Sequence, residues 1–174
     1  MKTIKLIFFM LLLFAMMQGF TGCSNDENKN LSVDESKRIE NKLTASKEVE
    51  DFFNMALPNE GQESHCFFTS LNPQKDICYV VNSRDEFLSL YSCSEALPDI
   101  DFDKQSLIIG MSMLSGGYKI EEFDVEETSE AIVINLSIRK YEGTSFTALF
   151  PNYYWGLYNK LHNKIVTTKN HIEE

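Results

Sequence analysis

The stretch that decides the fold is LIIGMSML, residues 107–114, which is followed by the turn residues Ser115-Gly116-Gly117. Apolar side chains occupy neighbouring positions here, apart from Gly110 and Ser112. A strand with one solvent-exposed face would instead alternate apolar and polar residues. Such a pattern is typical of a strand that is covered on both faces. We therefore predict a central strand at 107–114 and a hairpin turn at 115–117.

The residues after this turn predict an acidic hairpin. Alternation from Tyr118 to Val125 slips between Glu121 and Glu122, and a β-bulge there would restore a single apolar face. In the next segment Ile132, Ile134, Leu136 and Ile138 recur at every second position. Asn135, Ser137 and Arg139 face outward, as expected of a half-buried antiparallel strand.

Before the central strand, the pattern predicts two helices and two shorter strands. Ser46 can cap a helix of about ten residues that Pro58 stops, and Ser83 with Glu86 forms a capping box for a second helix. The strands are predicted at 66–68 and at 77–81, where apolar residues run together.

After the hairpin, a strand is predicted to begin at Phe146 and to be interrupted by Pro151, and a final edge strand is predicted at 165–168. A chain of 174 residues suits one core. The predicted fold class is α+β: one antiparallel sheet of about six strands with one or two helices packed on it, in a single domain at 46–174.

The N-terminal part predicts export and anchoring. Lys2 and Lys5 precede an apolar run of about 12 residues, which is typical of a signal peptide at 1–22. The sequence FTGC at 20–23 resembles the bacterial lipobox, which implies that Cys23 is acylated, although Phe20 replaces the usual Leu. The alternative is that the chain is secreted without a lipid anchor and that Cys23 is not acylated. Residues 23–45 then form the acylated Cys and a flexible stalk, because they hold few apolar side chains.

The acidic segment SNDE at 24–27 is similar to a signal that sends lipoproteins of Bacteroidetes to the outer face of the outer membrane. An ordinary solvated linker is the alternative. We therefore expect a lipoprotein of the outer membrane that faces the periplasm or the cell surface. Its acyl chains hold it to the membrane.

A family resemblance rests on short motifs in a fixed order: VNS at 81–83, EF at 86–87, Pro98, DF at 101–102, LIIG at 107–110 and SGGYKI at 115–120. With these motifs, residues 78–158 resemble the C-terminal domain of protease-complex-stabilising (PrcB-like) lipoproteins. The chain is still more similar to small uncharacterised lipoproteins of Bacteroidetes. The resemblance implies binding to an envelope protein, with possible stabilisation or inhibition of a protease, and no catalysis.

Charge and missing motifs exclude several functions. The net charge of −10 becomes −12 when Lys2 and Lys5 leave with the leader, so nucleic acid is a poor partner. His65, His162 and His171 show no pattern that couples them to a Cys nucleophile, and no pair has the spacing of metal ligands. We expect no enzyme activity, no metal and no cofactor.

Three cysteines remain after acylation of Cys23, and an exported chain meets an oxidising compartment. A strand and the helix that packs back on it could bring Cys78 and Cys93 within disulfide distance, so this pair is predicted. A bridge between Cys66 and Cys78, or three buried thiols, are the alternatives.

Two surfaces are predicted to bind a partner. Glu122, Asp124 and Glu126 lie in the strongest acidic cluster of the sequence. This cluster is either an ordinary solvated hairpin or a surface that attracts a basic partner. Tyr153 and Trp155 belong to a segment with aromatics on both strand faces, so these rings either pack in the core or contact a protein or a glycan. The leading hypothesis is a non-enzymatic protein-binding module, and the competing one is a glycan-binding accessory lipoprotein.

Overall fold

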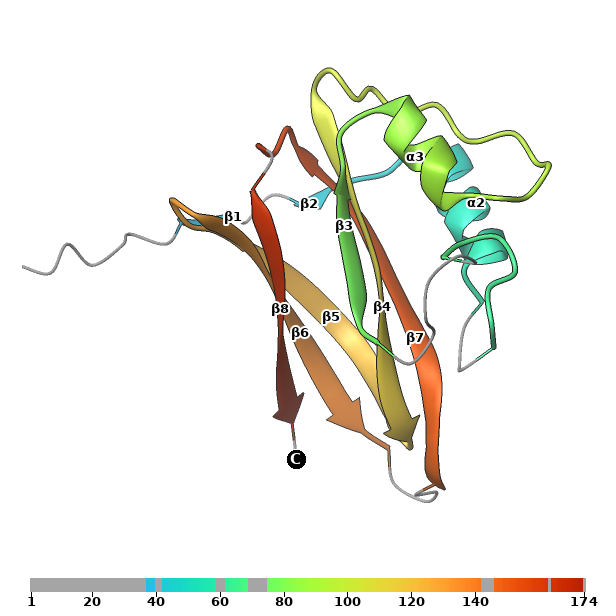
Figure 1. Ribbon diagram of the computed structural model, residues 1–174, viewed down its shortest axis with the longest axis vertical. Helices are drawn as coiled ribbons and strands as arrows, with labels where there is room; N and C mark the ends of the chain where they lie inside the picture. The colour runs from blue at the N-terminus through green and yellow to red at the C-terminus, as the bar shows by residue number, and fades with distance from the viewer. Residues whose placement is uncertain are drawn as a thin grey trace, which may run out of the picture. The chain divides into compact units, whose positions relative to one another are not determined.

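The computed structural model describes residues 37–39, 42–58, 62–68, 75–141, 146–162 and 164–173 (Figure 1). This part of the chain forms two four-stranded sheets and two helices. The first sheet has the order β1 (Lys37–Ile39), β5 (Tyr118–Glu127), β6 (Ala131–Lys140) and β8 (Ile165–Glu173). The second has the order β2 (Lys42–Leu43), β7 (Phe146–Asn159), β4 (Gln105–Gly116) and β3 (Ile77–Val81). The helices are α2 (Lys47–Ala56) and α3 (Arg84–Leu90).

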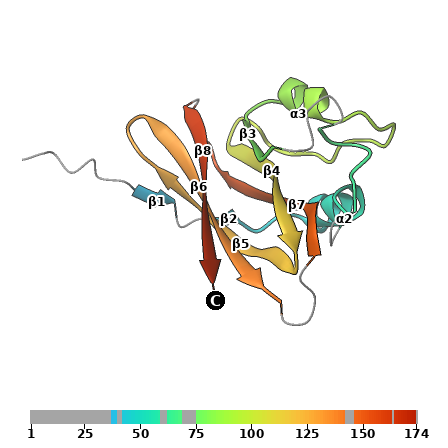
Figure 2. The ribbon, with the colours of Figure 1, turned by 60° about the horizontal axis from the view of Figure 1, so that its bottom comes forward.

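Two apolar cores separate three layers. One core lies between the sheets and includes Ile108 of β4, the alternating apolar residues of β6, and Tyr154 and Tyr158 of β7. The other lies between the second sheet and the helices, where Leu107 and Ile109 meet the aromatic face of α2. Figure 2 shows the first sheet and the helices on opposite sides of the second sheet. Because β4 is covered on both faces, the prediction of a central strand is confirmed.

The α+β class and the mainly antiparallel pairing are confirmed, but the prediction of one sheet of about six strands is wrong. The difference arises at Gly117, whose φ of 94° lies in the region that glycine adopts without strain. The chain turns there from β4 in the second sheet into β5 in the first. The turn at 115–117 therefore joins two sheets and is not a hairpin.

The β5–β6 hairpin and its bulge are confirmed. Ile120 pairs with Ile138 and Glu122 with Ser137, so Glu121 is the extra residue on β5. The final edge strand is also confirmed, but it is longer than predicted and runs parallel to β6. Parallel pairing is possible because the chain crosses through β7 of the second sheet before it returns to the first.

Two predictions for strands are wrong. The segment at 66–68 forms only one bridge, between Phe67 and Tyr91, and the positive φ of Phe68 ends it. In contrast, β7 runs through Pro151, which pairs with Met113 of β4. Proline has no N–H to donate to a neighbouring strand. The edge of β7 that faces away from β4 pairs with β2 only at Leu157 and Tyr158, so among the described residues no strand lies beside Pro151 on that edge.

Both predicted helices form, and their caps explain where they begin. The Ser46 side chain accepts a hydrogen bond from the Val49 N–H at 3.4 Å, and the Ser83 side chain accepts one from the Glu86 N–H at 3.2 Å. The Glu86 carboxylate accepts from the Asn82 N–H at 2.5 Å, one residue earlier than a capping box requires.

The boundary between stalk and domain lies earlier than predicted. Within 23–45, β1 pairs with residues 125–127 of β5, and β2 pairs with β7, so the ordered domain includes both strands. The predicted signal peptide at 1–22, Cys23 and residues 24–36 lie outside the described residues.

Candidate functional site

The disulfide joins Cys66 to Cys93, with 5.0 Å between their Cα atoms, and Cys78 is a free thiol. The prediction of a Cys78–Cys93 bridge is therefore wrong. Strand geometry gives the reason. Cys78 packs toward the core between the sheets, whereas Cys66 and Cys93 pack against the core on the helix side. The second sheet thus separates Cys78 from Cys93.

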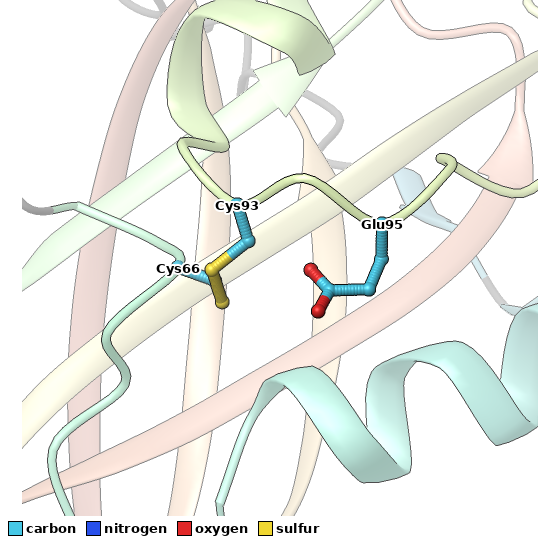
Figure 3. A group of neighbouring side chains, drawn as sticks. All are labelled: Cys66, Cys93 and Glu95. Carbon is cyan, nitrogen blue, oxygen red and sulfur yellow. A yellow bond between two sulfur atoms is a disulfide. The ribbon is translucent and has the colours of Figure 1, made fainter.

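A third polar side chain lies beside this bridge. The carboxylate of Glu95 extends toward the two sulfurs, and the three ligand atoms all lie within 4.8 Å of one another (Figure 3). The Tyr91 hydroxyl donates a hydrogen bond to Glu95 Oε2 at 3.0 Å. Burial of Tyr91, together with this carboxylate, raises the pKa of Tyr91 to about 12, so its proton stays in place at neutral pH. Sequence reasoning missed this cluster, because only the pairing of two loops brings Cys66 to Cys93 and Glu95.

Backbone hydrogen bonds hold the two loops together beside the disulfide. The Ser92 N–H donates to the Cys66 carbonyl at 2.8 Å, and the Phe68 N–H donates to the Leu90 carbonyl at 3.3 Å. The bridge between Phe67 and Tyr91 lies between these two bonds. The placement of Cys66 beside Cys93 therefore does not depend on the sulfur–sulfur bond alone.

The aromatic segment contributes mainly to packing. Trp155 stacks on Phe53 of α2 with 4.3 Å between ring centroids, and Tyr153 stacks near Phe68 at 6.5 Å. The Tyr153 hydroxyl accepts a hydrogen bond from the Ser64 N–H at 2.9 Å. Both side chains are only partly exposed, and they pack against the core on the helix side. Of the predicted roles for Tyr153 and Trp155, core packing is confirmed.

The acidic residues of β5 lie in the other sheet from Trp155. Phe123 and Val125 of β5 pair with the apolar positions of β6 that form the core between the sheets, so by alternation Glu122, Asp124 and Glu126 belong to the opposite face. Asp124 accepts a hydrogen bond from Asn135 at 2.9 Å. The first sheet and the helix-side core lie on opposite sides of the second sheet, so the structure does not bring the two predicted binding surfaces together.

A lysine stabilises one carboxylate at the end of the hairpin. Lys164 Nζ lies 2.8 Å from Glu127 Oε1 and donates to the Thr128 carbonyl at 2.6 Å. The hydrogen bond from Lys164 holds the pKa of Glu127 below its ordinary value, and His162 at 3.7 Å adds to the effect. This ion pair joins the loop before β8 to the tip of the hairpin.

A groove that sequence reasoning missed lies along α2. It has a volume of about 470 Å³ and separates the helix from the loop that contains Pro98. Its lining combines apolar and charged side chains: Lys47, Glu48, Asp51, Phe52, Met55, Ala96 and Pro98. Met55 is 79% exposed, the largest exposure of any large apolar side chain among the described residues. One feature of the sequence could have indicated this exposure, because Met55 falls outside the stripe of buried residues on α2 that Val49, Phe52 and Phe53 form.

In the described part of the chain, neither helix is long and apolar enough to cross a membrane. Comparison with protein-family models, with curated proteins and with solved structures found no match to this chain. The resemblance to PrcB-like lipoproteins therefore stays a prediction.

Proposed function

We propose that the mature chain is a lipid-anchored protein of the bacterial envelope that binds a partner protein and does not catalyse a reaction. The anchor rests on the lipobox-like sequence that ends at Cys23. The binding role rests on the groove along α2, which replaces Trp155 as the apolar anchor and offers an exposed apolar side chain beside carboxylates.

The observation that carries the proposal is the exposure of Met55. The side chain of Met55 is large, apolar and 79% exposed. A partner that buries it completely would stabilise the complex by about 1.5–3 kcal/mol. Methionine also adapts its shape to different partners, because it is unbranched and polarisable. Phe52, Ala96 and Pro98 extend the apolar lining around it.

The charges of the groove indicate which partner fits. Glu48 and Asp51 line it against a single lysine, Lys47, and the whole chain carries a net charge of −10. Complementary charge accelerates association and excludes partners of like charge. The proposed partner therefore presents an apolar side chain flanked by lysine or arginine.

Peptides of defined charge test this chemistry. The probes are short peptides with a central Leu, Met or Phe between Lys or Arg residues, and the same peptides with Glu in place of the basic residues. In methyl NMR spectra of the methionine-labelled chain, the basic set should shift the Met55 signal and leave that of Met113, on β4, unchanged. Equal shifts with both sets, or no shift with either, would contradict the proposal.

Variants locate the binding charge. Glu48→Gln with Asp51→Asn should weaken binding of the basic peptides. Glu122→Gln with Glu130→Gln removes the same number of charges from two exposed glutamates of the β5–β6 hairpin and serves as the matched control. If the control loses as much affinity as the groove variant, the peptides are attracted by the net charge of the chain and not by the groove.

Crosslinking in the envelope tests whether a natural partner uses the same surface. A photoreactive residue at position 55 should give one discrete protein adduct, and the same residue at the exposed Leu88 of α3 should not. Adducts that are identical from both positions would mean nonspecific capture.

The anchor has a separate test. Cys23→Ala should abolish acylation and release the chain from the membrane fraction, because the apolar run before it is shorter than the roughly 20 residues that span a bilayer. Partition of the variant into detergent would show that the anchor assignment is wrong.

A further inference from the structure

We propose that Cys66, Cys93 and Glu95 form a binding site for a soft divalent metal ion, Zn²⁺ or Cd²⁺, when the disulfide is reduced. The two sulfurs and a carboxylate oxygen lie within 4.8 Å of one another. The bridge engages both sulfurs in the oxidised chain, so this site exists only after reduction. The proposal is independent of the groove along α2.

The ligand set suits such ions. Thiolates bind Zn²⁺ at about 2.3 Å and carboxylates at about 2.0–2.2 Å, in tetrahedral geometry. Two sulfurs on one tetrahedral ion are roughly 3.8 Å apart. Rotation of the side chains can supply this separation, because the Cα atoms are already 5.0 Å apart. Three protein ligands leave the fourth position of the ion to water.

The backbone keeps the ligands together after reduction. The hydrogen bond from Ser92 to the Cys66 carbonyl and the bridge between Phe67 and Tyr91 do not involve sulfur. The neighbouring rings of Phe67 and Tyr91, with 5.0 Å between their centroids, pack in the helix-side core beneath this pairing. The site is therefore preorganised by the same contacts that form the disulfide in the oxidised chain.

Glu95 has the support that a metal ligand requires. Tyr91 donates to Glu95 Oε2 at 3.0 Å, which orients the carboxylate and leaves its other oxygen for the ion. Partners of this kind typically change metal affinity by about 10–100-fold.

The chemistry balances with a dithiol as the reductant. The disulfide gains two electrons and two protons and becomes two thiols, while the dithiol is oxidised to its own disulfide. The metal ion then binds both sulfurs as thiolates and displaces their two protons into solvent. Affinity should therefore fall as the pH falls.

Cadmium titration tests the site. The full chain is reduced with dithiothreitol, freed from reductant by anaerobic gel filtration and titrated with Cd²⁺, with thiolate-to-metal charge transfer followed in the ultraviolet. One Cd²⁺ should bind per chain, with release of two protons, and Zn²⁺ should compete for the same site. The oxidised chain should show no charge-transfer band.

Variants assign the ligands. Cys66→Ser should abolish the signal, and Glu95→Gln should weaken binding by more than about tenfold, since it removes a direct ligand. Glu122→Gln is the matched carboxylate control. Cys23→Ser with Cys78→Ser keeps the proposed pair and should retain full affinity.

The result that would overturn the proposal is a reduced wild-type chain that binds Cd²⁺ no more tightly than Cys66→Ser, or a Glu95→Gln variant with unchanged affinity. Circular dichroism follows the fold in parallel. If reduction unfolds the chain and one equivalent of metal restores it, the proposal is supported. If metal does not restore the fold, the proposal is refuted.

Discussion

Loss of the Cys66–Cys93 disulfide is expected to lower the free energy of unfolding by about 3.5 kcal/mol. The bridge joins residues that are 27 apart in sequence. On the chain-entropy model, a closed loop of this length removes about 12 cal/mol/K from the unfolded chain, which corresponds to that free energy at 25 °C. For a urea dependence of about 2 kcal/mol/M, the midpoint of unfolding should fall by roughly 1.8 M.

The assay is urea unfolding with and without reductant, followed by the fluorescence of the single tryptophan. Trp155 is a suitable reporter, because its ring stacks on Phe53 in the helix-side core. Reductant should destabilise the wild type and Cys78→Ser by the same amount. It should have no effect on Cys66→Ser with Cys93→Ser, which already lacks the bridge.

Two results would refute this reasoning. One is mass mapping of the unreduced chain that finds Cys78 linked to Cys93. The other is a reductant effect below about 1 kcal/mol in the wild type, since native disulfides typically contribute 2–5 kcal/mol in small exported domains.

Three further substitutions test the packing and the charge network. Trp155→Ala should cost roughly 3 kcal/mol in urea unfolding and Trp155→Phe much less, whereas a cost below 1 kcal/mol for the alanine variant would mean that the ring is not a core element. Gly110→Ala should cost about 1–3 kcal/mol, because its Cβ would overlap the ring of Tyr154, and Tyr154→Leu in the same chain should remove most of that additional cost. Lys164 lowers the pKa of Glu127, so the stabilisation by this pair is fully present above the unfolded-chain pKa of about 4.3 and is lost as the pH falls through the lower folded pKa. Glu127→Gln should therefore destabilise the chain by at most about 1 kcal/mol at pH 7, and the difference from wild type should disappear in acid; an undiminished difference at pH 2 would contradict the assignment.

The candidate site was only partly predictable. Alternation in β7 correctly placed Tyr153 and Trp155 on one face and Tyr154 on the other, but it could not say which elements would cover each face. The helix α2, whose Phe53 precedes Trp155 by about a hundred residues, covers the face that carries Trp155. The groove and the Glu95 cluster were missed for the same reason, because each is formed by segments whose contact no local pattern encodes.

Local physical chemistry, by itself, determined most of the secondary structure of this protein. The caps at Ser46 and Ser83, the bulge at Glu121 and the apolar run at 107–114 depend on the side chains of neighbouring residues, which a sequence displays directly. They were therefore found from the sequence, as was the α+β class.

Only the tertiary structure decided how these elements divide between two sheets and which cysteine pairs with Cys93. The pattern of a strand shows which side chains share a face. It does not show which element will pack on that face, because any apolar surface of suitable shape buries it with a similar free energy. The turn at Gly117 sends β5 into the other sheet, and β3 directs Cys78 to the core between the sheets, on the side away from Cys93. Hydrophobic burial is non-directional, so the choice between such arrangements lies in the packing of the whole domain and not in any one segment.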